Sequence, residues 1–332
     1  MEQNLLWMAS FLRNKRARLR PHFKVHQVLS LAAKQIQAGA IGITCARLDH
    51  AEALAQYGIK NILIANEIVG DQPIQRFVEL SLNTEVIVAV DNARVVSDMA
   101  GAAGKWKDKL NVVVDLDVGL GRCGVPPGEA AVSLAKVVLE QGLRFRGLTA
   151  HRGNLRLSDD REKQEMVCPV MHTLVSCKQL IERAGIPVEI VSCGGTSDYA
   201  IAGTFPGITE IQAGSYLLMD TWYLPFAEPF RPSLTVLATV ISKSSGRIVV
   251  NAGTKTTSGQ RGLPSVKGIH GLQVTALHAE HTIIDLLDPS VSIEVGDRVE
   301  IWVHHLDATV SLHRKMHGIR TGEVEEVFQI EA

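Results

Sequence analysis

The sequence has no long apolar run. Its apolar stretches, such as 86–90 and 112–114, are far shorter than the roughly 18 residues that a membrane-spanning helix needs. Hydrophobic residues make up 46% of the 332-residue chain and charged residues 21%, close to the usual mix of globular proteins. We therefore expect a globular protein that does not enter a membrane.

The chain also lacks an excess of charge of either sign. Its 34 Lys and Arg residues balance 35 Asp and Glu residues, for a formal net charge of -1. Such a chain has no general basic field to gather phosphate backbones or anionic lipids. Nucleic acid is therefore not expected as a partner.

Paired cysteines, targeting signals and repeats are missing as well. The five cysteines form no C-x-x-C pair, and the basic segment 13–20 is not followed by an apolar segment with a cleavage site. We therefore expect a reducing, cytoplasmic compartment. No fixed period or low-complexity tract points to a solenoid or a disordered arm.

Short β-branched runs do alternate with amphipathic stretches between residues 18 and 216, a pattern typical of α/β proteins. Glycines at the ends of several amphipathic stretches, Gly58, Gly142 and Gly185, indicate helix C-termini. Eight predicted strands with alternating helices favour a (β/α)8 TIM barrel, with a doubly wound sheet as the structural alternative. The eight predicted strands are 19–22, 42–45, 61–65, 85–91, 111–117, 145–151, 189–193 and 209–213.

The pattern changes after Tyr223. Two prolines lie within 226–232, and short strand-like segments separated by turn residues follow. This predicts a barrel domain at 1–231 and a C-terminal all-β domain at 232–332. The strands expected in the second domain are 234–242, 247–250, 273–277, 282–286 and 297–302.

Lys24 follows the first predicted barrel strand, where barrel enzymes place functional groups. A lysine at a loop is ordinarily a solvated surface residue. Between His22 and His26, however, neighbouring cations and partial desolvation could lower the pKa of its amine enough for a Schiff base. The residues at the other strand ends distinguish a surface lysine from a Schiff-base lysine.

Three further strand ends carry groups that suit an anionic cofactor. Strand five leads into a glycine-rich loop that can bring Arg122 over the barrel mouth, although a turn with a solvated arginine is an equal alternative. Strands seven and eight end in glycine and hydroxyl clusters at 192–197 and 212–216, where barrels commonly bind phosphate. A phosphate cradle, a lysine and an arginine on one face are what pyridoxal phosphate requires.

The C-terminal domain carries four histidines between residues 304 and 317. If segment 302–313 is extended, His305 and Asp307 project to one face of a strand, close enough to share a metal. A structural histidine beside a surface aspartate is the ordinary alternative. Imidazole and carboxylate ligands suit Mn, Zn or Mg.

Taken together, the motifs resemble those of fold-type III pyridoxal phosphate enzymes related to D-threonine aldolase and eukaryotic-type D-serine dehydratase, within the alanine racemase barrel superfamily. The similar motifs are R-P-H-x-K-x-H at 20–26, D-x-G-x-x-R-C-G at 117–124, S-C-G-G-T-S at 192–197, Q-A-G-S-Y at 212–216 and H-x-D-A-T-V-x-L-H at 305–313. The resemblance implies Lys24 as the Schiff-base lysine and His305 and Asp307 as metal ligands. It implies a cofactor site made of His22, Lys24, Arg122, His151, Gly194, Gly195, Thr196, Gly214, Ser215 and Tyr216.

The chain departs from the family pattern after strand six. It has A-H-R-G-N at 150–154, where family members usually have an aromatic residue followed by Gly-His near the pyridine ring. Asn251 and Gln27 also differ from the usual family residues. The family's opening strand is missing, so we expect a β domain that is short of one edge and an intact cofactor site.

The resemblance implies a lyase that depends on pyridoxal phosphate and a divalent metal and cleaves D-β-hydroxy-α-amino acids to glycine and an aldehyde. Aspartate at the second ligand position resembles the aldolase branch, whereas the dehydratase branch typically has cysteine there. The alternatives are a dehydratase of D-serine or D-3-hydroxyaspartate, a racemase, and a noncatalytic pyridoxal phosphate carrier. The resemblance also implies a homodimer.

Overall fold

The structure, a computed structural model, describes residues 1–153 and 160–331. The chain forms two compact units. One contains Leu5–Lys24 and Leu29–Gly214, and the other contains Met1–Asn4, Val25–Val28 and Ser215–Ala332. The domain division at 231/232 stays a prediction.

The larger unit is built on eight parallel strands in the order β1-β8-β7-β6-β5-β4-β3-β2. Backbone bonds from Ile41 N to Leu19 O and from Thr44 N to Pro21 O, both 2.9 Å, join β1 to β2 and close the ring. A doubly wound sheet has two edges and is excluded. All eight predicted strands are present: β1 (Arg18–Leu19), β2 (Ile43–Cys45), β3 (Ile62–Glu67), β4 (Val86–Val90), β5 (Asn111–Leu116), β6 (Arg144–Ala150), β7 (Ile190–Cys193) and β8 (Glu210–Ile211).

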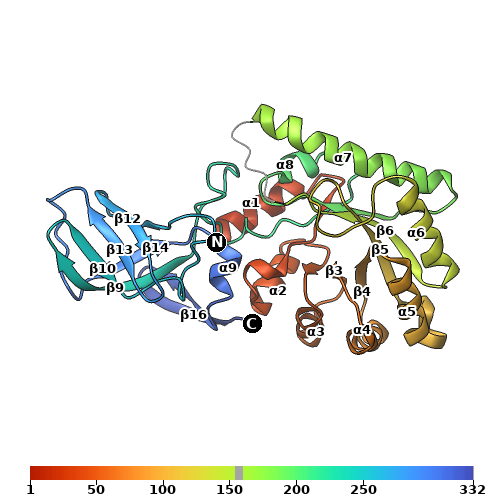
Figure 1. The fold of residues 1–332 in the computed structure, drawn as a ribbon, viewed down its shortest axis with the longest axis horizontal. Helices are drawn as coiled ribbons and strands as arrows, with labels where there is room; N and C mark the ends of the chain where they lie inside the picture. Colours follow the sequence, from red (N-terminus) through yellow and green to blue (C-terminus); the bar gives the residue numbers. More distant parts are fainter. Residues whose placement is uncertain (154–159, 332) are drawn as a thin grey trace. The chain divides into compact units, whose positions relative to one another are not determined.

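Amphipathic helices lie outside these strands, as Figure 1 shows for α3, α4, α5 and α6. Their apolar faces pack on the strands, and Gly58, Gly142 and Gly185 all have positive φ where the preceding helix ends. The predicted helix ends are therefore confirmed. The helices are α1 (Glu2–Leu12), α2 (Leu29–Gln37), α3 (Leu48–Gln56), α4 (Asp71–Asn83), α5 (Ala93–Ala103), α6 (Glu129–Glu140), α7 (Asp160–Arg183) and α8 (Tyr199–Ala202), with 3-10 turns η1 (Phe23–Val25) and η2 (Gly104–Lys109).

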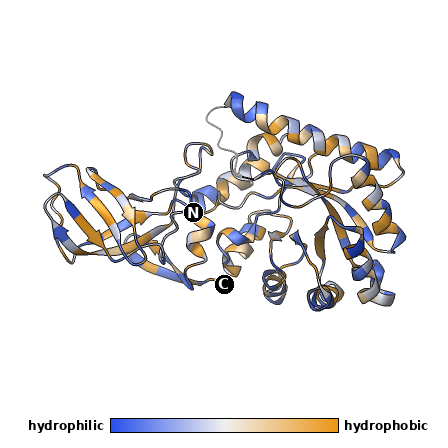
Figure 2. Ribbon diagram, viewed as in Figure 1, coloured by the Kyte–Doolittle hydropathy of each residue, from blue (hydrophilic) through white to orange (hydrophobic). Residues whose placement is uncertain are grey.

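The barrel core is apolar because its strands are buried on both faces. Leu63, Ile87, Val113 and Ile190, from four different strands, form one buried cluster. Burying a side chain of this size contributes about 1.5–3 kcal/mol. Figure 2 shows the strands largely in the hydrophobic colour and the helices divided between polar and apolar residues.

The smaller unit is an antiparallel β structure. Its main sheet has the order β11-β14-β9-β10-β13-β12, and β15 pairs with β16 separately. The five predicted strands are present, whereas β11, β15 and β16 were not predicted because they are very short or rich in polar residues. The strands are β9 (Thr235–Ser244), β10 (Arg247–Val250), β11 (Ser265–Val266), β12 (Leu272–Leu277), β13 (Thr282–Leu286), β14 (Arg298–Trp302), β15 (Lys315–Arg320) and β16 (Glu323–Gln329), and helix α9 spans Leu306–Val310.

Across residues 1–153 and 160–331, none of the helices has both the length and the hydropathy of a membrane span.

Candidate active site

Lys24 lies in the 3-10 turn η1, directly after β1. The turn brings its backbone amide to the ring of His22, whose Nδ1 lies 3.4 Å from Lys24 N. Both residues are half-buried. His22 therefore contacts the segment that carries the predicted Schiff-base lysine.

The loop that carries Arg122 is shaped by glycines and by Asp117. Asp117 Oδ1 accepts hydrogen bonds of 2.9–3.0 Å from the amides of Gly119, Leu120 and Gly121. Gly124 has φ +105°, and a Cβ there would lie 2.5 Å from Asp117 N, so only glycine fits. The loop thus turns back on itself and presents Arg122 as an exposed side chain.

His151 follows β6 and shares an environment with the two cations. Desolvation by surrounding protein groups, together with the positive charges of Lys24 and Arg122, lowers the pKa of His151 to about 4. The imidazole remains accessible to solvent and is neutral at physiological pH. Three predicted cofactor residues therefore lie together at one end of the barrel, whereas Asn154 lies outside the described residues.

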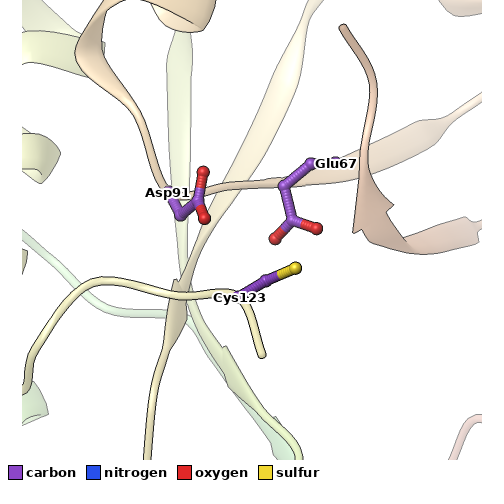
Figure 3. Close-up of side chains that lie close together, drawn as sticks. All are labelled: Glu67, Asp91 and Cys123. Atoms are coloured by element: carbon purple, nitrogen blue, oxygen red, sulfur yellow. The ribbon is translucent and has the colours of Figure 1, made fainter. Parts of the chain in front are cut away.

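An acidic cluster that the sequence analysis missed lies beside Arg122. The ligating atoms of Glu67, Asp91 and Cys123 all fall within 4.8 Å of one another (Figure 3). Asp91 Oδ2 accepts a 3.1 Å hydrogen bond from Gly124 N, which ties the arginine loop to the end of β4. The signal that could have found two of its members was the position of Glu67 and Asp91 at the ends of two consecutive strands, β3 and β4.

Asp115, at the end of β5, has a pKa raised into the neutral range. Desolvation, the charge of Glu67 and a hydrogen bond with Glu67 raise the pKa of Asp115 to about 7, and Arg122 opposes this shift. Glu67 Oε1 is buried without a hydrogen-bond partner of its own among the described residues. The barrel end therefore contains a proton-binding acidic group beside its cations.

The predicted phosphate clusters divide between the two units. In the barrel, Gly194, Gly195 and Thr196 follow β7, and the amide of Gly195 donates to Asp198 Oδ1 at 2.5 Å. Desolvation raises the pKa of Asp198 to about 6. One of the amides expected to bind phosphate thus already has a carboxylate partner.

The second cluster begins in the barrel unit and continues in the other. Gly214 is the last residue of the barrel unit, whereas Ser215 and Tyr216 belong to the smaller unit. There Ser215 O accepts a 2.7 Å bond from Met219 N, and the buried ring of Tyr216 lies 5.6 Å from that of Phe230. Phosphate binding by these residues stays a prediction.

Arg20, the first residue of the lysine motif, has a structural position. Its buried guanidinium forms two hydrogen bonds with Glu210, of 2.8 and 2.6 Å, and also binds Asn61. This bidentate ion pair connects β1 to β8. Arg20 is therefore already paired with a carboxylate inside the barrel.

His305 and Asp307 meet in the smaller unit, although segment 302–313 is not extended, which was the condition for the two side chains to share a strand face. Strand β14 ends at Trp302, His305 is the N-cap of α9, and Asp307 lies in its first turn. The helix start turns the chain so that His305 Nε2 and Asp307 Oδ1 lie 2.8 Å apart. The other ring nitrogen, Nδ1, lies 3.4 Å from Ser258 Oγ.

Residues 220–223 form hydrogen bonds with the segment that carries His305 and Asp307. The buried carboxylate of Asp220 accepts hydrogen bonds from Leu306 N at 3.0 Å and Tyr223 N at 2.9 Å. Thr221 N donates to Val303 O at 3.1 Å, and Thr221 Oγ1 lies 2.7 Å from Nδ1 of His304. The helix start is therefore fixed from both sides of His305.

The residues fit the two groups that the sequence predicted. Two ligand atoms at right angles around a metal, each about 2.1 Å from it, lie about 3 Å apart, and His305 Nε2 and Asp307 Oδ1 are 2.8 Å apart. Ser258 beside Nδ1 of His305 matches the outer partner that a metal-binding histidine needs. At the barrel end, an amine, a guanidinium and a neutral imidazole form a donor set that suits pyridoxal phosphate.

A closed parallel barrel with a lysine after its first strand and an arginine on its fifth loop, followed by an antiparallel sheet, defines the fold-type III class of pyridoxal phosphate enzymes. The chain belongs to the alanine racemase family. The family model "Alanine racemase, N-terminal domain" matches residues 1–221. A second model, "Putative serine dehydratase domain", matches residues 233–319.

Three relatives resemble the chain over essentially its whole length. A D-threonine aldolase of Arthrobacter is 33% identical over 340 residues, covering 100% of this chain and 89% of the relative. A 3-hydroxy-D-aspartate aldolase of Paracoccus denitrificans is 30% identical over 346 residues, with the same coverage. The crystal structure of D-threonine aldolase from Filomicrobium marinum superposes with a TM-score of 0.93 at 31% identity, covering 99% of this chain and 92% of that one.

Proposed function

We propose that the protein is a lyase that uses pyridoxal phosphate and a divalent metal to cleave D-β-hydroxy-α-amino acids to glycine and an aldehyde. The observation that carries the proposal is the His305–Asp307 pair, with Nε2 and Oδ1 2.8 Å apart, in a chain whose barrel also brings Lys24 and Arg122 to one site. A noncatalytic cofactor carrier would have no use for the metal-type pair. Aldolase relatives that align along the whole chain support the same choice.

The barrel residues would bind and orient the cofactor. Lys24 would hold it through its amine, Arg122 would pair with its phenolic oxygen, and the neutral imidazole of His151 would lie against it without adding charge. Asp115, with its pKa of about 7, can bind or release a proton beside Arg122. The cofactor, when bound, supplies the electron sink for bond cleavage.

His305 and Asp307 would hold the metal, which would lower the pKa of a substrate hydroxyl near it. The net reaction removes the β-hydroxyl proton, breaks the Cα–Cβ bond and returns a proton to Cα, so that glycine and an aldehyde are the products. Mn, Mg and Zn all accept an imidazole and a carboxylate. Activity with each of these metals would show which one the enzyme uses.

The products of the purified enzyme test the proposal. D-threonine, D-serine and D-3-hydroxyaspartate would each be supplied with pyridoxal phosphate and a series of divalent metals. We expect glycine with acetaldehyde from D-threonine, and glycine with glyoxylate from D-3-hydroxyaspartate. Pyruvate from D-serine, with no glycine from D-threonine, would establish a dehydratase instead.

The variant Lys24→Ala provides the control. It should lose the Schiff-base absorbance of bound pyridoxal phosphate together with product formation, because it has no amine at this position. A spectrum identical to that of the unchanged protein would remove Lys24 from its proposed role.

A homodimer and a cytoplasmic location belong to the same proposal. The five cysteines are all free thiols, which suits a reducing compartment. Light scattering with the purified protein would measure the oligomeric state.

A further inference from the structure

Arg261 lies against two aromatic rings in the smaller unit. Its guanidinium carbon is 4.3 Å from the ring centre of Trp222 and 5.6 Å from that of Tyr223. Such contacts stabilise a guanidinium and restrict its movement. The side chain of Arg261 also forms a hydrogen bond with that of Tyr223. Among the described residues, no carboxylate oxygen forms an ion pair with Arg261 within 4.0 Å, so the donors that Tyr223 does not engage can meet an anion.

The metal-type pair lies close to this arginine. Trp222 and Tyr223 follow directly after Asp220 and Thr221, which bond to segment 303–306. On the other side, a Cβ added to Gly262 would lie 3.3 Å from His304 Nε2, so the residue after Arg261 contacts the neighbour of His305. The aromatic rings thus position a cation beside the His305–Asp307 segment.

The electrostatics of Tyr223 agree with this placement. Desolvation raises the pKa of Tyr223 to about 12, and the charges of Arg261, Asp220 and Asp307 all act on its phenol as well. Arg261 and Asp307 therefore lie within Coulombic range of one hydroxyl group. A divalent metal held by His305 and Asp307 would add two further positive charges nearby, an environment that favours an anionic substituent over a methyl group.

We propose that Arg261 is a specificity-determining residue that binds a carboxylate on the β-carbon of the substrate, so that the enzyme prefers D-3-hydroxyaspartate to D-threonine. The proposal rests on the retro-aldol function proposed above. A metal that holds the β-hydroxyl brings the other substituent of the same carbon to its immediate surroundings. A guanidinium pairs with a carboxylate through two parallel hydrogen bonds, whereas a methyl group offers it nothing.

The first test compares kcat/KM for the two substrates in the variants Arg261→Gln and Arg261→Lys. We expect the ratio of kcat/KM for D-3-hydroxyaspartate to that for D-threonine to exceed 1 in the unchanged enzyme and to fall about 100-fold in Arg261→Gln, as for loss of a desolvated charge pair. Arg261→Lys should retain part of the preference, because it keeps the charge without the bidentate geometry.

Lys267 offers a matched control in the same unit. Its amine lies 5.1 Å from the ring centre of Trp302, but it already pairs with Glu300 at 2.8 Å. The variant Lys267→Gln therefore removes a cation from an aromatic ring without touching the proposed site. Its substrate ratio should equal that of the unchanged enzyme.

Binding of substrate fragments provides a readout that does not depend on turnover. Malate and 3-hydroxybutyrate correspond to the two substrates without their amine. They differ by a carboxylate in place of a methyl group on the carbon that carries the hydroxyl, and each has a hydroxyl for the metal. With Mn²⁺ present, calorimetry should give a ratio of the dissociation constant of 3-hydroxybutyrate to that of malate that is about 100-fold smaller in Arg261→Gln than in the unchanged protein.

The outcomes separate the two proposals. If Arg261→Gln lowers kcat/KM for both substrates equally, or leaves both values of kcat/KM unchanged, Arg261 does not select the β-substituent. The inference is then wrong, while the lyase assignment stands. If the unchanged enzyme forms no glycine from either substrate, the retro-aldol assignment fails. The fragment-binding ratio then still decides whether Arg261 binds a carboxylate.

Discussion

At the scale of single residues, the barrel end contains groups whose ionisation differs from that in water. His151 is neutral because desolvation and two nearby cations lower its pKa to about 4. Asp115 binds a proton because desolvation and Glu67 raise its pKa to about 7. Shifts in opposite directions within one site are typical of enzymes that move protons.

The raised pKa of Asp115 predicts a pH-dependent gain in stability from Asp115→Asn. Between about pH 4 and 7 the folded protein binds a proton here that the unfolded chain has lost, so the stability contributed by protonation is lost as the pH rises through 7. The asparagine is uncharged at every pH. We expect its melting temperature to exceed that of the unchanged protein by about 2–4 °C at pH 8, with little difference at pH 4, measured by calorimetry.

Asp117, two residues further along, supplies the matched control. Three backbone amides, those of Gly121, Gly119 and Leu120, hold the pKa of its carboxyl below the usual range. Asp117→Asn should therefore lower the melting temperature at pH 8 rather than raise it. A gain of the same size in both variants would mean that lost negative charge, and not the environment of Asp115, explains the effect.

At the scale of elements, two short segments position the candidate ligands. The loop 117–124 depends on Asp117, on Asp91 and on the positive φ of Gly124. The start of α9 depends on Asp220, whose buried carboxylate accepts a bond from Leu306 N, between His305 and Asp307. Regular secondary structure ends next to both segments, so side chains and not strand pairing determine their shape.

Asp220→Asn should weaken metal binding more than it weakens the fold. Leu306 N and Tyr223 N bond to different oxygens of Asp220. In asparagine one of these oxygens is replaced by an NH2 group, which only donates, so the helix start loses a constraint. Loss of such an outer partner typically costs 10–100-fold in metal affinity. We expect a Kd for Mn²⁺ that is higher by about this factor, measured by calorimetry.

Asp297 in the same unit is the control for this substitution. It also accepts a backbone hydrogen bond, from Glu294 N at 2.7 Å, but in an exposed turn that contacts neither His305 nor Asp307. Asp297→Asn should leave the Mn²⁺ affinity unchanged. Equal losses in the two variants would show that Asp220 does not act on the ligand pair in particular.

At the scale of the whole molecule, the candidate cofactor residues and the candidate metal ligands belong to different units. Lys24, Arg122 and His151 lie in the barrel, whereas His305 and Asp307 lie in the smaller unit. Each set has its own supporting hydrogen bonds within its unit. Removal of the metal therefore need not release the cofactor.

Chelation of the metal should separate catalysis from cofactor binding. Treatment with EDTA is expected to abolish glycine formation while the Schiff-base absorbance of bound pyridoxal phosphate persists, and Mn²⁺ should restore activity. Parallel measurement of the spectrum and of product formation checks this. Turnover that is insensitive to the chelator would exclude a catalytic role for a metal at His305 and Asp307.

The sequence by itself determined the barrel and the identity of its most conspicuous groups. Strands buried on both faces have nearly continuous apolar runs, so β4 and β5 are visible without tertiary information. Parallel strands place their C-terminal ends at one edge, so Lys24 and Arg122 could be predicted to lie at the same end of the barrel.

Only the tertiary structure decided which groups meet and how they are paired. The acidic cluster joins residues from β3 and from the segments after β4 and β5, and the helix start at His305 depends on Asp220, some 85 residues earlier in the chain. Desolvation and long-range hydrogen bonds create these features. Because both depend on neighbours that are distant in sequence, a local pattern can place acidic residues at strand ends but cannot show which contacts they make.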